Sequence, residues 1–182
     1  KLRINSYLIN KEKELIEKFD KIWPRIFDID NAIKLFWKNK DISILEIWCF
    51  SWREYSYIRN FTKNYTGIDI SKDAIRYAKN QFSDWEFIIW DIEDYNFEKK
   101  YDIIFAFASL IHSDRETTQR LFEKFHSILT PKWIIYVSLK ASEKYSEIEK
   151  IDEFWTRIYY HYNMNEYKKN SENKFKIIYE DT

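Results

Sequence analysis

Two short apolar runs, each ending near a carboxylate, constrain this chain more than any other feature. The first is ISILEIWCFSW at residues 42–52, which contains Glu46. The second is GIDIS at residues 67–71, which contains Asp69. A strand, a tight turn, a helix and a second strand ending in an acid are the layout of a first βαβ unit that holds a nucleotide-like cofactor. We therefore expect a parallel sheet with a ligand at the carboxyl ends of its strands.

The totals in the sequence limit the class of protein. At 182 residues the chain is long enough for one domain with a full core. Thirty basic and thirty acidic residues cancel, which leaves no electrostatic argument for nucleic acid or an anionic membrane. A single cysteine excludes a disulfide framework, and no apolar run approaches the roughly 20 residues of a membrane span. With no signal-peptide pattern, we expect a soluble, cytoplasmic protein.

Strand and helix patterns alternate through the middle of the chain. Strands are predicted at residues 43–47, 65–70, 86–90, 101–110 and 130–140. Helices are predicted at residues 53–61, 71–82 and 114–129. The run at 101–110 is the most continuously apolar, which predicts a central strand. Alternation this regular predicts a doubly wound, mostly parallel α/β sheet with helices on both faces.

The two ends of the chain are predicted to carry further elements. At the N-terminus, residues 1–20 and a second helix through Phe36 have amphipathic spacing, with Pro24 between them and Asp28 or Asp30 as the second helix's cap. We expect residues 1–38 to cover the ligand site of a core at 39–182, within a single domain. The C-terminal part is predicted as helix 145–154, extended 156–162, helix 164–173 and strand 175–181.

The glycine content is the most unusual part of the composition. Proteins average about 7% glycine, which would be roughly 13 residues here, yet the chain has one glycine and eight tryptophans. The turn after the first strand needs glycine because the backbone bends sharply and a cofactor lies against it. The residues in the glycine positions of this turn are Trp48, Phe50 and Trp52.

Taken together, the motifs resemble those of class I S-adenosylmethionine-dependent methyltransferases. The family pattern is an acid and a glycine-rich turn after strand one, an acid ending strand two, an acid after strand three, a YDII-type strand four and an L-K-P-G-G turn before strand five. Here these stand as EIWCFSW, GIDIS, WDIED, YDIIFAFASLIH and LTPKWIIYVS, over about residues 40–140. The C-terminal part looks like the tail of small-molecule members, with the last antiparallel strand of the sheet missing.

The resemblance implies a cofactor, S-adenosylmethionine, and a role for each motif residue. Glu46 and the turn would face the methionine part, and Asp69 would hold the ribose hydroxyls. Ile70 would pack against the adenine, Asp91 would accept from its amino group and Ile92 would cover the ring. The turn residues of this predicted site are Trp48, Cys49, Phe50, Ser51 and Trp52, and the residues after strand four are Phe107 and Ala108. For both aspartates the alternative is a strand-end acid that caps the next turn or helix.

Methyl transfer from a sulfonium needs alignment and exclusion of water, and a base only when the acceptor must lose a proton. His112, just past the fourth strand, is the best placed candidate base, although a loop histidine can equally be structural. Tyr159, Tyr160 and Tyr162 could line an acceptor pocket or pack within a strand. No Cys/His cluster has metal-ligand spacing, so we expect no metal.

The tryptophans admit two interpretations. Taken literally, the indoles obstruct the cofactor turn. Alternatively, the natural gene reads UGA as glycine, because several tryptophans stand where the family commonly carries glycine; UGG codons at 48, 52 and 133 would contradict this. The tryptophans concerned are Trp48, Trp52, Trp90, Trp133 and Trp155.

Three functions remain open at this stage. The first is methyl transfer to a small-molecule acceptor, impaired by Trp48 and Trp52. The second is an inactive binding or interaction module with the same fold. The third is a nicotinamide-dependent oxidoreductase, against which the DIED and LTPKWII motifs argue.

Overall fold

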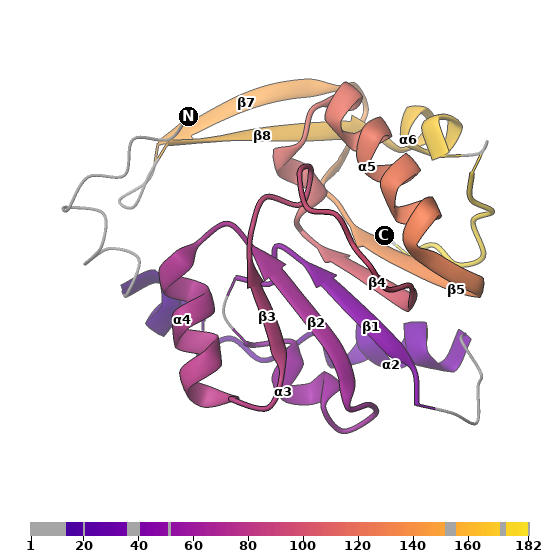
Figure 1. Ribbon diagram of the computed structural model, residues 1–182. Coiled ribbons are helices and arrows are strands. Elements are labelled where there is room, and N and C mark those ends of the chain that lie inside the picture. The colour runs from indigo at the N-terminus through magenta and orange to yellow at the C-terminus, as the bar shows by residue number, and fades with distance from the viewer. Residues whose placement is uncertain are drawn as a thin grey trace.

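The computed structural model describes residues 14–19, 21–35, 41–50, 52–151, 156–171 and 174–181. Within them, five parallel strands form the central sheet in the order β3-β2-β1-β4-β5. The bounds are β1 (Ser43–Ile47), β2 (Asn64–Asp69), β3 (Glu86–Ile89), β4 (Tyr101–Phe107) and β5 (Leu129–Ser138). Helices cover both faces of this sheet (Figure 1). The predicted doubly wound α/β fold is therefore confirmed.

The strand β1 lies at the centre of the sheet, with all five of its residues buried. Its neighbour β2 contains the chain's single glycine, Gly67, which is paired with Glu46. A Cβ atom on Gly67 would stand 2.9 Å from the sulfur of Cys49 and 2.9 Å from a ring carbon of Phe87. A side chain at this position would therefore push apart β2, β3 and the turn that follows β1.

The helices divide between two buried clusters, one on each face of the sheet. Residues of α2 (Ile26–Leu35), α3 (Tyr55–Ile58) and α4 (Lys72–Gln81) belong to one cluster. Residues of α5 (Arg115–Ile128) and α6 (Met164–Ser171) belong to the other. The residues of α4 and α5 that face the sheet are buried, as is Leu129 at the start of β5: Ala74, Ile75, Ala78, Leu121, Phe122, Phe125 and Ile128.

Helix caps follow the sequence in two places. The hydroxyl of Ser71 accepts a hydrogen bond from the Ala74 amide at 3.1 Å, which starts α4 as predicted. The carboxylate of Asp114 accepts one from the Thr117 amide at 2.7 Å and starts α5. Each cap pairs an amide of the first helical turn that would otherwise lack a partner, and so fixes the residue at which the helix begins.

The helix predicted at 145–154 is wrong. Residues 146–151 form β7 (Ser146–Ile151), which pairs antiparallel with β8 (Thr156–Asn163), and β8 also pairs with the short β6 (Ala141–Ser142). The aromatic β8 offers Ile148 a cross-strand tyrosine, Tyr159, and such pairs outweigh a weak helical pattern. In Figure 1 the β7–β8 hairpin lies above the carboxyl ends of the sheet strands.

The strand predicted at 175–181 is also wrong. This segment forms no ladder; it runs beside β5, with which it lines a groove of about 590 Å³. In the described part of the chain β5 pairs with β4 alone, so the sheet ends at β5.

The N-terminal predictions are confirmed in part. Residues 14–19 are helical, with Leu15 and Ile16 buried, and the rest of 1–20 lies outside the described residues. The helix α2 begins at Ile26, so Asp28 and Asp30 lie inside it and are not its caps. Among the described helices, none is long and apolar enough to cross a bilayer.

The helix predicted at 53–61 is shortened to the four residues of α3. The rest of the connection from β1 to β2 consists of turns on either side of α3. The turn after β1 is therefore longer and less regular than the predicted strand–turn–helix unit implied.

Candidate functional site

The strand order reverses between β1 and β4, and open α/β sheets form a crevice outside the carboxyl ends of their strands at such a point. Ile47 of β1 is paired with Ile68 of β2, and the Cys49 amide donates to the Ile68 carbonyl at 3.2 Å. From the other side, the Ser109 hydroxyl donates to the Ile47 carbonyl at 3.0 Å. Three strand ends thus meet at the switch point, which is where open α/β sheets bind ligands.

Asp69 organises one side of this crevice. One carboxylate oxygen accepts from the Phe50 amide at 2.8 Å and the other from the Ser71 amide at 2.8 Å. The side chain is only 6% exposed, and burial raises its pKa to about 6 against the opposing effect of the backbone donors. Each oxygen keeps a lone pair for a ligand hydroxyl. Both predicted roles, ligand acceptor and strand-end cap, are compatible with this geometry.

The turn after β1 has the backbone of a glycine-rich turn without the glycines. Trp48 has φ of 48° and Phe50 has φ of 52°, both in the left-handed region. Residues with side chains are strained there, at a cost on the order of 1–3 kcal/mol each. At positions 48 and 50 the sequence has aromatic residues in place of the expected glycines. The backbone at both positions takes a conformation that favours glycine.

The aromatic side chains of the turn pack onto neighbouring elements. Trp48 contacts the cluster beneath α5, and the ring of Phe50 lies 5.4 Å from that of Phe19. The Trp52 ring lies 5.3 Å from Phe82, and its indole nitrogen is buried without a hydrogen-bond partner. Ser51 lies outside the described residues. The turn is therefore filled with apolar rings.

Glu46 and Cys49 lie below the crevice floor. Glu46 is 3% exposed and accepts a hydrogen bond from the Tyr65 hydroxyl at 2.8 Å. Burial, and then the negative charge of Glu54, raise the pKa of Glu46 well above its usual value. Burial also raises the pKa of the Cys49 thiol. Both groups are adjacent to the turn and are buried.

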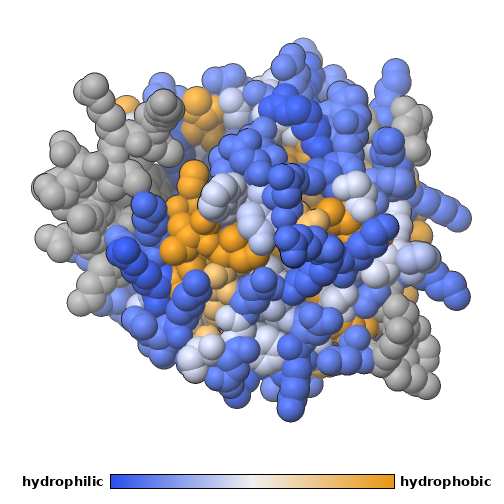
Figure 2. Space-filling model, viewed as in Figure 1, coloured by the Kyte–Doolittle hydropathy of each residue, from blue (hydrophilic) through white to orange (hydrophobic). Residues whose placement is uncertain are grey.

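The turn after β3 contributes Asp91. The Trp90 amide donates to the Asp69 carbonyl at 3.0 Å, which brings this turn against β2. One oxygen of Asp91 accepts from the Glu93 amide at 3.0 Å and holds its own turn. Ile70 is 56% exposed, and Figure 2 shows an apolar patch over the carboxyl ends of β2 and β3. Ile92, in contrast, is fully buried in the core.

The end of β4 meets the N-terminal segment. The guanidinium of Arg25 lies 5.3 Å from the ring centre of Phe107 and pairs with Glu54 at 2.6 Å. Ala108 has φ of 49°, and its amide donates to the Ser138 hydroxyl at 2.8 Å. The segment before α2 is thus anchored directly beside the crevice.

Glu54 is a site residue that the sequence did not reveal. Its carboxylate is almost fully buried and takes charge-assisted hydrogen bonds from Arg25 and Arg53. An acidic residue in a helix that is predicted to lie at the surface is normally exposed to solvent. The local sequence therefore gives no sign that Glu54 is buried. Arg25, which sequence patterns left as solvated charge or part of a lid, is an ion-pair partner of this buried acid.

His112 lies beyond β4 and is held by the hairpin. Its Nδ1 is 3.0 Å from the Ile158 carbonyl oxygen, so Nδ1 carries the proton that is donated. The neutral ring then presents Nε2 as an acceptor. Partial desolvation lowers the pKa of His112, and the positive charges of Arg157 and Lys140 lower it further, against the effect of the Ile158 hydrogen bond. The lowered pKa keeps the imidazole neutral near pH 7, with a lone pair on Nε2.

Metal ligation has no support in the part of the chain that the structure describes. It contains no group of three or more His, Cys, Asp and Glu side chains that could hold an ion.

Comparison with known proteins now adds to this geometry. A family model described as a methyltransferase domain matches residues 48–132, from the turn after β1 to the start of β5. Malonyl-(acyl-carrier protein) O-methyltransferase 2 of Ilyobacter polytropus is 31% identical over 147 residues, which cover 75% of this chain. The chain carries a methyltransferase domain and has the class I S-adenosylmethionine-dependent methyltransferase fold.

Solved structures agree with the methyltransferase fold. A crystal structure of an S-adenosylmethionine-dependent methyltransferase from Clostridium acetobutylicum superposes with a TM-score of 0.71 at 15% identity, covering 93% of this chain and 87% of that one. The plantazolicin methyltransferase BpumL, solved with S-adenosylhomocysteine, gives 0.60 at 24% identity, covering 70% and 51%. This methyltransferase chain spans 55% of the length of the Ilyobacter relative and 26% and 31% of two other relatives.

Proposed function

We propose that this chain binds S-adenosylmethionine and transfers its methyl group to a small-molecule acceptor by in-line displacement. We further propose that Trp48 and Trp52 weaken this function in the sequence as it stands. The observation that carries the proposal is Asp69: a buried carboxylate, tied to the turn after β1 and to the start of α4, at the switch point of the sheet.

The residues on the β2–β3 side fit the sugar and base of such a cofactor. Asp69 would accept from two ribose hydroxyls, and charge-assisted hydrogen bonds of this kind are strong. Asp91 would accept from the adenine amino group, with exposed Ile70 as an apolar cover on one side and Ile92 as support from the core. When bound, the cofactor supplies a methyl group already activated on a sulfonium.

The turn side fits the cofactor less well. Glu46 and residues 48–52 would face its methionine part, together with Phe107 and Ala108 after β4. In that region the rings of Trp48, Phe50 and Trp52 take the place of glycines. We therefore expect weak affinity in the literal sequence.

The residues beyond β4 would serve the acceptor. With Nδ1 bonded to the Ile158 carbonyl, His112 would receive the acceptor's proton at Nε2. Residues 1–38 would cover the crevice and exclude water; the Phe19–Phe50 contact and the Arg25–Glu54 pair support this position for the part described. The names of the relatives, which act on an acyl-carrier-linked substrate and on plantazolicin, support an acceptor other than nucleic acid.

The test is calorimetric titration of the double variant Trp48→Gly/Trp52→Gly with S-adenosylhomocysteine, and in parallel with NAD. We expect micromolar binding of the first and none of the second. A matched triple variant that adds Asp69→Ala should lose the binding. Binding of neither compound by the folded double variant would favour an inactive module with this fold, and binding of NAD would favour an oxidoreductase.

A further inference from the structure

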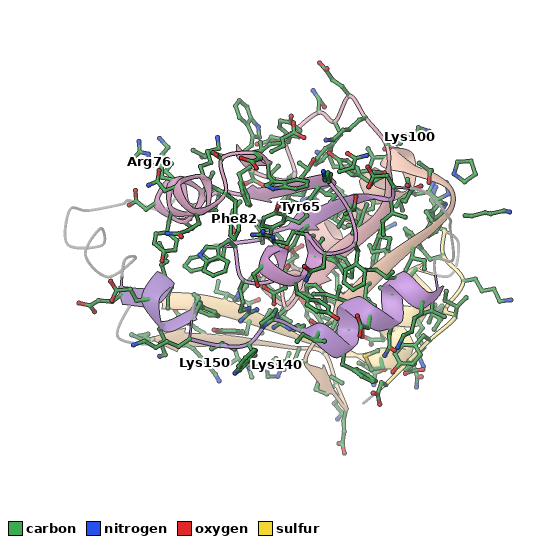
Figure 3. The ribbon with its side chains drawn as sticks, turned by 90° about the horizontal axis from the view of Figure 1, so that it is seen from below. Tyr65, Arg76, Phe82, Lys100, Lys140 and Lys150 are labelled. Atoms are coloured by element: carbon green, nitrogen blue, oxygen red, sulfur yellow. The ribbon has the colours of Figure 1, made fainter. Side chains whose placement is uncertain are left out.

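A group of basic side chains surrounds one tyrosine on the β7–β8 hairpin. The ring centre of Tyr159 lies 5.1 Å from the Nζ of Lys140, 5.6 Å from the Nζ of Lys150 and 5.6 Å from the Cζ of Arg157. The ring of His112 lies 4.8 Å away on centroids. We call His112, Lys140, Lys150, Arg157 and Tyr159 the basic cluster. Lys140 and Lys150 are labelled in Figure 3, where they lie next to each other.

The basic cluster carries like charges in direct opposition. Lys150 and Arg157 are partners in the antiparallel ladder, and like charges directly opposite each other destabilise a sheet. Neither Lys140 nor Lys150 forms an ion pair within the described ranges. Cationic groups gathered around one ring make this a favourable place for an anion.

The acids of β7 do not neutralise the basic cluster. In the antiparallel ladder Glu147 is paired with Tyr160, and Glu149 is paired with Ile158. Each of these pairs lies one residue along the strand from a pair that contains Tyr159 or Arg157. Successive strand residues point to opposite faces, so these glutamates lie on the other face of the hairpin. The face that carries Tyr159 is therefore the positive one.

The basic cluster also lies on the acceptor side of the crevice. His112 follows β4, whose end lies beside that of β1, and it is held to β8 through the Ile158 carbonyl. Asp69, the predicted cofactor ligand, stands on the far side of β1, at the end of β2. A molecule bound on the basic cluster would thus approach the switch point from the side opposite to the cofactor's sugar.

We propose that the basic cluster binds an anionic group, a carboxylate or a phosphate, of the small-molecule methyl acceptor, and so holds the acceptor beside His112. The proposal rests on the proposed function, since it concerns the acceptor of that reaction. Ammonium and guanidinium groups both form charge-assisted hydrogen bonds to such oxyanions. The Tyr159 ring would supply an apolar floor between them. The acceptor class is therefore a small acid.

The first experiment follows the histidine ring protons by NMR while inorganic phosphate, and separately acetate, is added. The chain has three histidines, so His126 on α5, which packs against Trp133 and Phe175, is an internal control. We expect a saturable shift of His112 and none of His126. A shift with phosphate alone would assign a phosphate acceptor, and one with acetate alone a carboxylate acceptor.

The charge variants decide whether the cluster is the cause. In Lys140→Gln/Lys150→Gln the apparent anion affinity at His112 should fall about tenfold, because two of the cationic groups around Tyr159 are removed. The matched control is Lys72→Gln/Lys79→Gln, which removes the same charge from exposed positions on α4. Lys140→Arg/Lys150→Arg should keep the affinity.

Two results would overturn the proposal: no saturable shift of His112 with either anion, or equal affinity in the two glutamine pairs. Its failure is distinguishable from failure of the proposed function. S-adenosylhomocysteine titrations of the same lysine variants, in the Trp48→Gly/Trp52→Gly background, should give unchanged affinity, because none of these lysines contacts the predicted cofactor residues. Absence of anion binding in the Trp48→Gly/Trp52→Gly protein itself, with normal cofactor binding, would reject the acceptor site alone.

Discussion

The two sides of the crevice differ in how they depend on sequence. On the β2 side, Asp69 is positioned by amides of Phe50 and Ser71, and any residue except proline supplies an amide. On the turn side, the backbone takes a left-handed conformation at Trp48 and Phe50, which glycine alone adopts without strain. The comparison teaches that a buried carboxylate at a strand end can keep its geometry while the adjacent turn loses the residues suited to its backbone.

The largest expected effect comes from repairing the turn. Trp48→Gly with Trp52→Gly removes one strained φ and two indoles, and we expect S-adenosylhomocysteine affinity to rise about 100- to 1000-fold, or roughly 3–4 kcal/mol. Calorimetry on both proteins measures it. The control is Trp133→Gly, because Trp133 packs against His126 and Phe175. An equal gain in the control, or none in the double variant, would remove the contrast between the two sides.

A smaller effect should come from the titration of Asp69. Its pKa of about 6 in the folded protein lies above the usual 3.8, so the folded state binds a proton more tightly than the unfolded state. The resulting stabilisation is complete below about pH 4 and is lost as pH rises through 6, by roughly 2–3 kcal/mol. Asp69→Asn should lack this loss, so urea unfolding from pH 4 to 8 should show the two stabilities diverging. Parallel curves would mean that Asp69 is not desolvated as described.

The smallest expected effect comes from Gly67 of β2, which packs against Cys49 of the turn and Phe87 of β3. Gly67→Ala places a methyl group against Cys49 and Phe87, and we expect a loss of about 1–2 kcal/mol in the free energy of unfolding. Thermal denaturation measures it. Gly67→Ala combined with Cys49→Ala should recover part of the loss, because one of the two close contacts disappears. An additive result in this double variant would show that the strain falls on Phe87 instead.

The sequence predicted the central sheet because its signals are strong there. β1 and β4 are apolar on both faces, as buried parallel strands are, and Ser71 is a cap that any sequence method expects. Asp69 and Asp91 were predicted as site residues for the same reason: they stand where apolar runs end. These signals are local, so they survive without a structure.

The missed features depend on residues far apart in the chain. The run at 145–154 has mixed periodicity, and only the tyrosine-rich β8 decides that it is a strand. The pair between Arg25 and Glu54 joins residues 29 apart, and the bond from Tyr136 to Asp28 joins residues 108 apart. Residue propensity argues against left-handed φ at a tryptophan, so only the alignment of the turn with the glycine-rich motif pointed to Trp48 and Phe50.

The C-terminal segment has a consequence for handling this protein. A ten-residue edge strand such as β5 exposes a row of amides and carbonyls to which another molecule could add a strand. Residues 175–181 run along that edge with Lys176, Glu180 and Asp181 exposed. The segment stands in the path of an added strand, but Ile177, Ile178 and Tyr179 are exposed between these charges, so it also presents an apolar surface to other molecules.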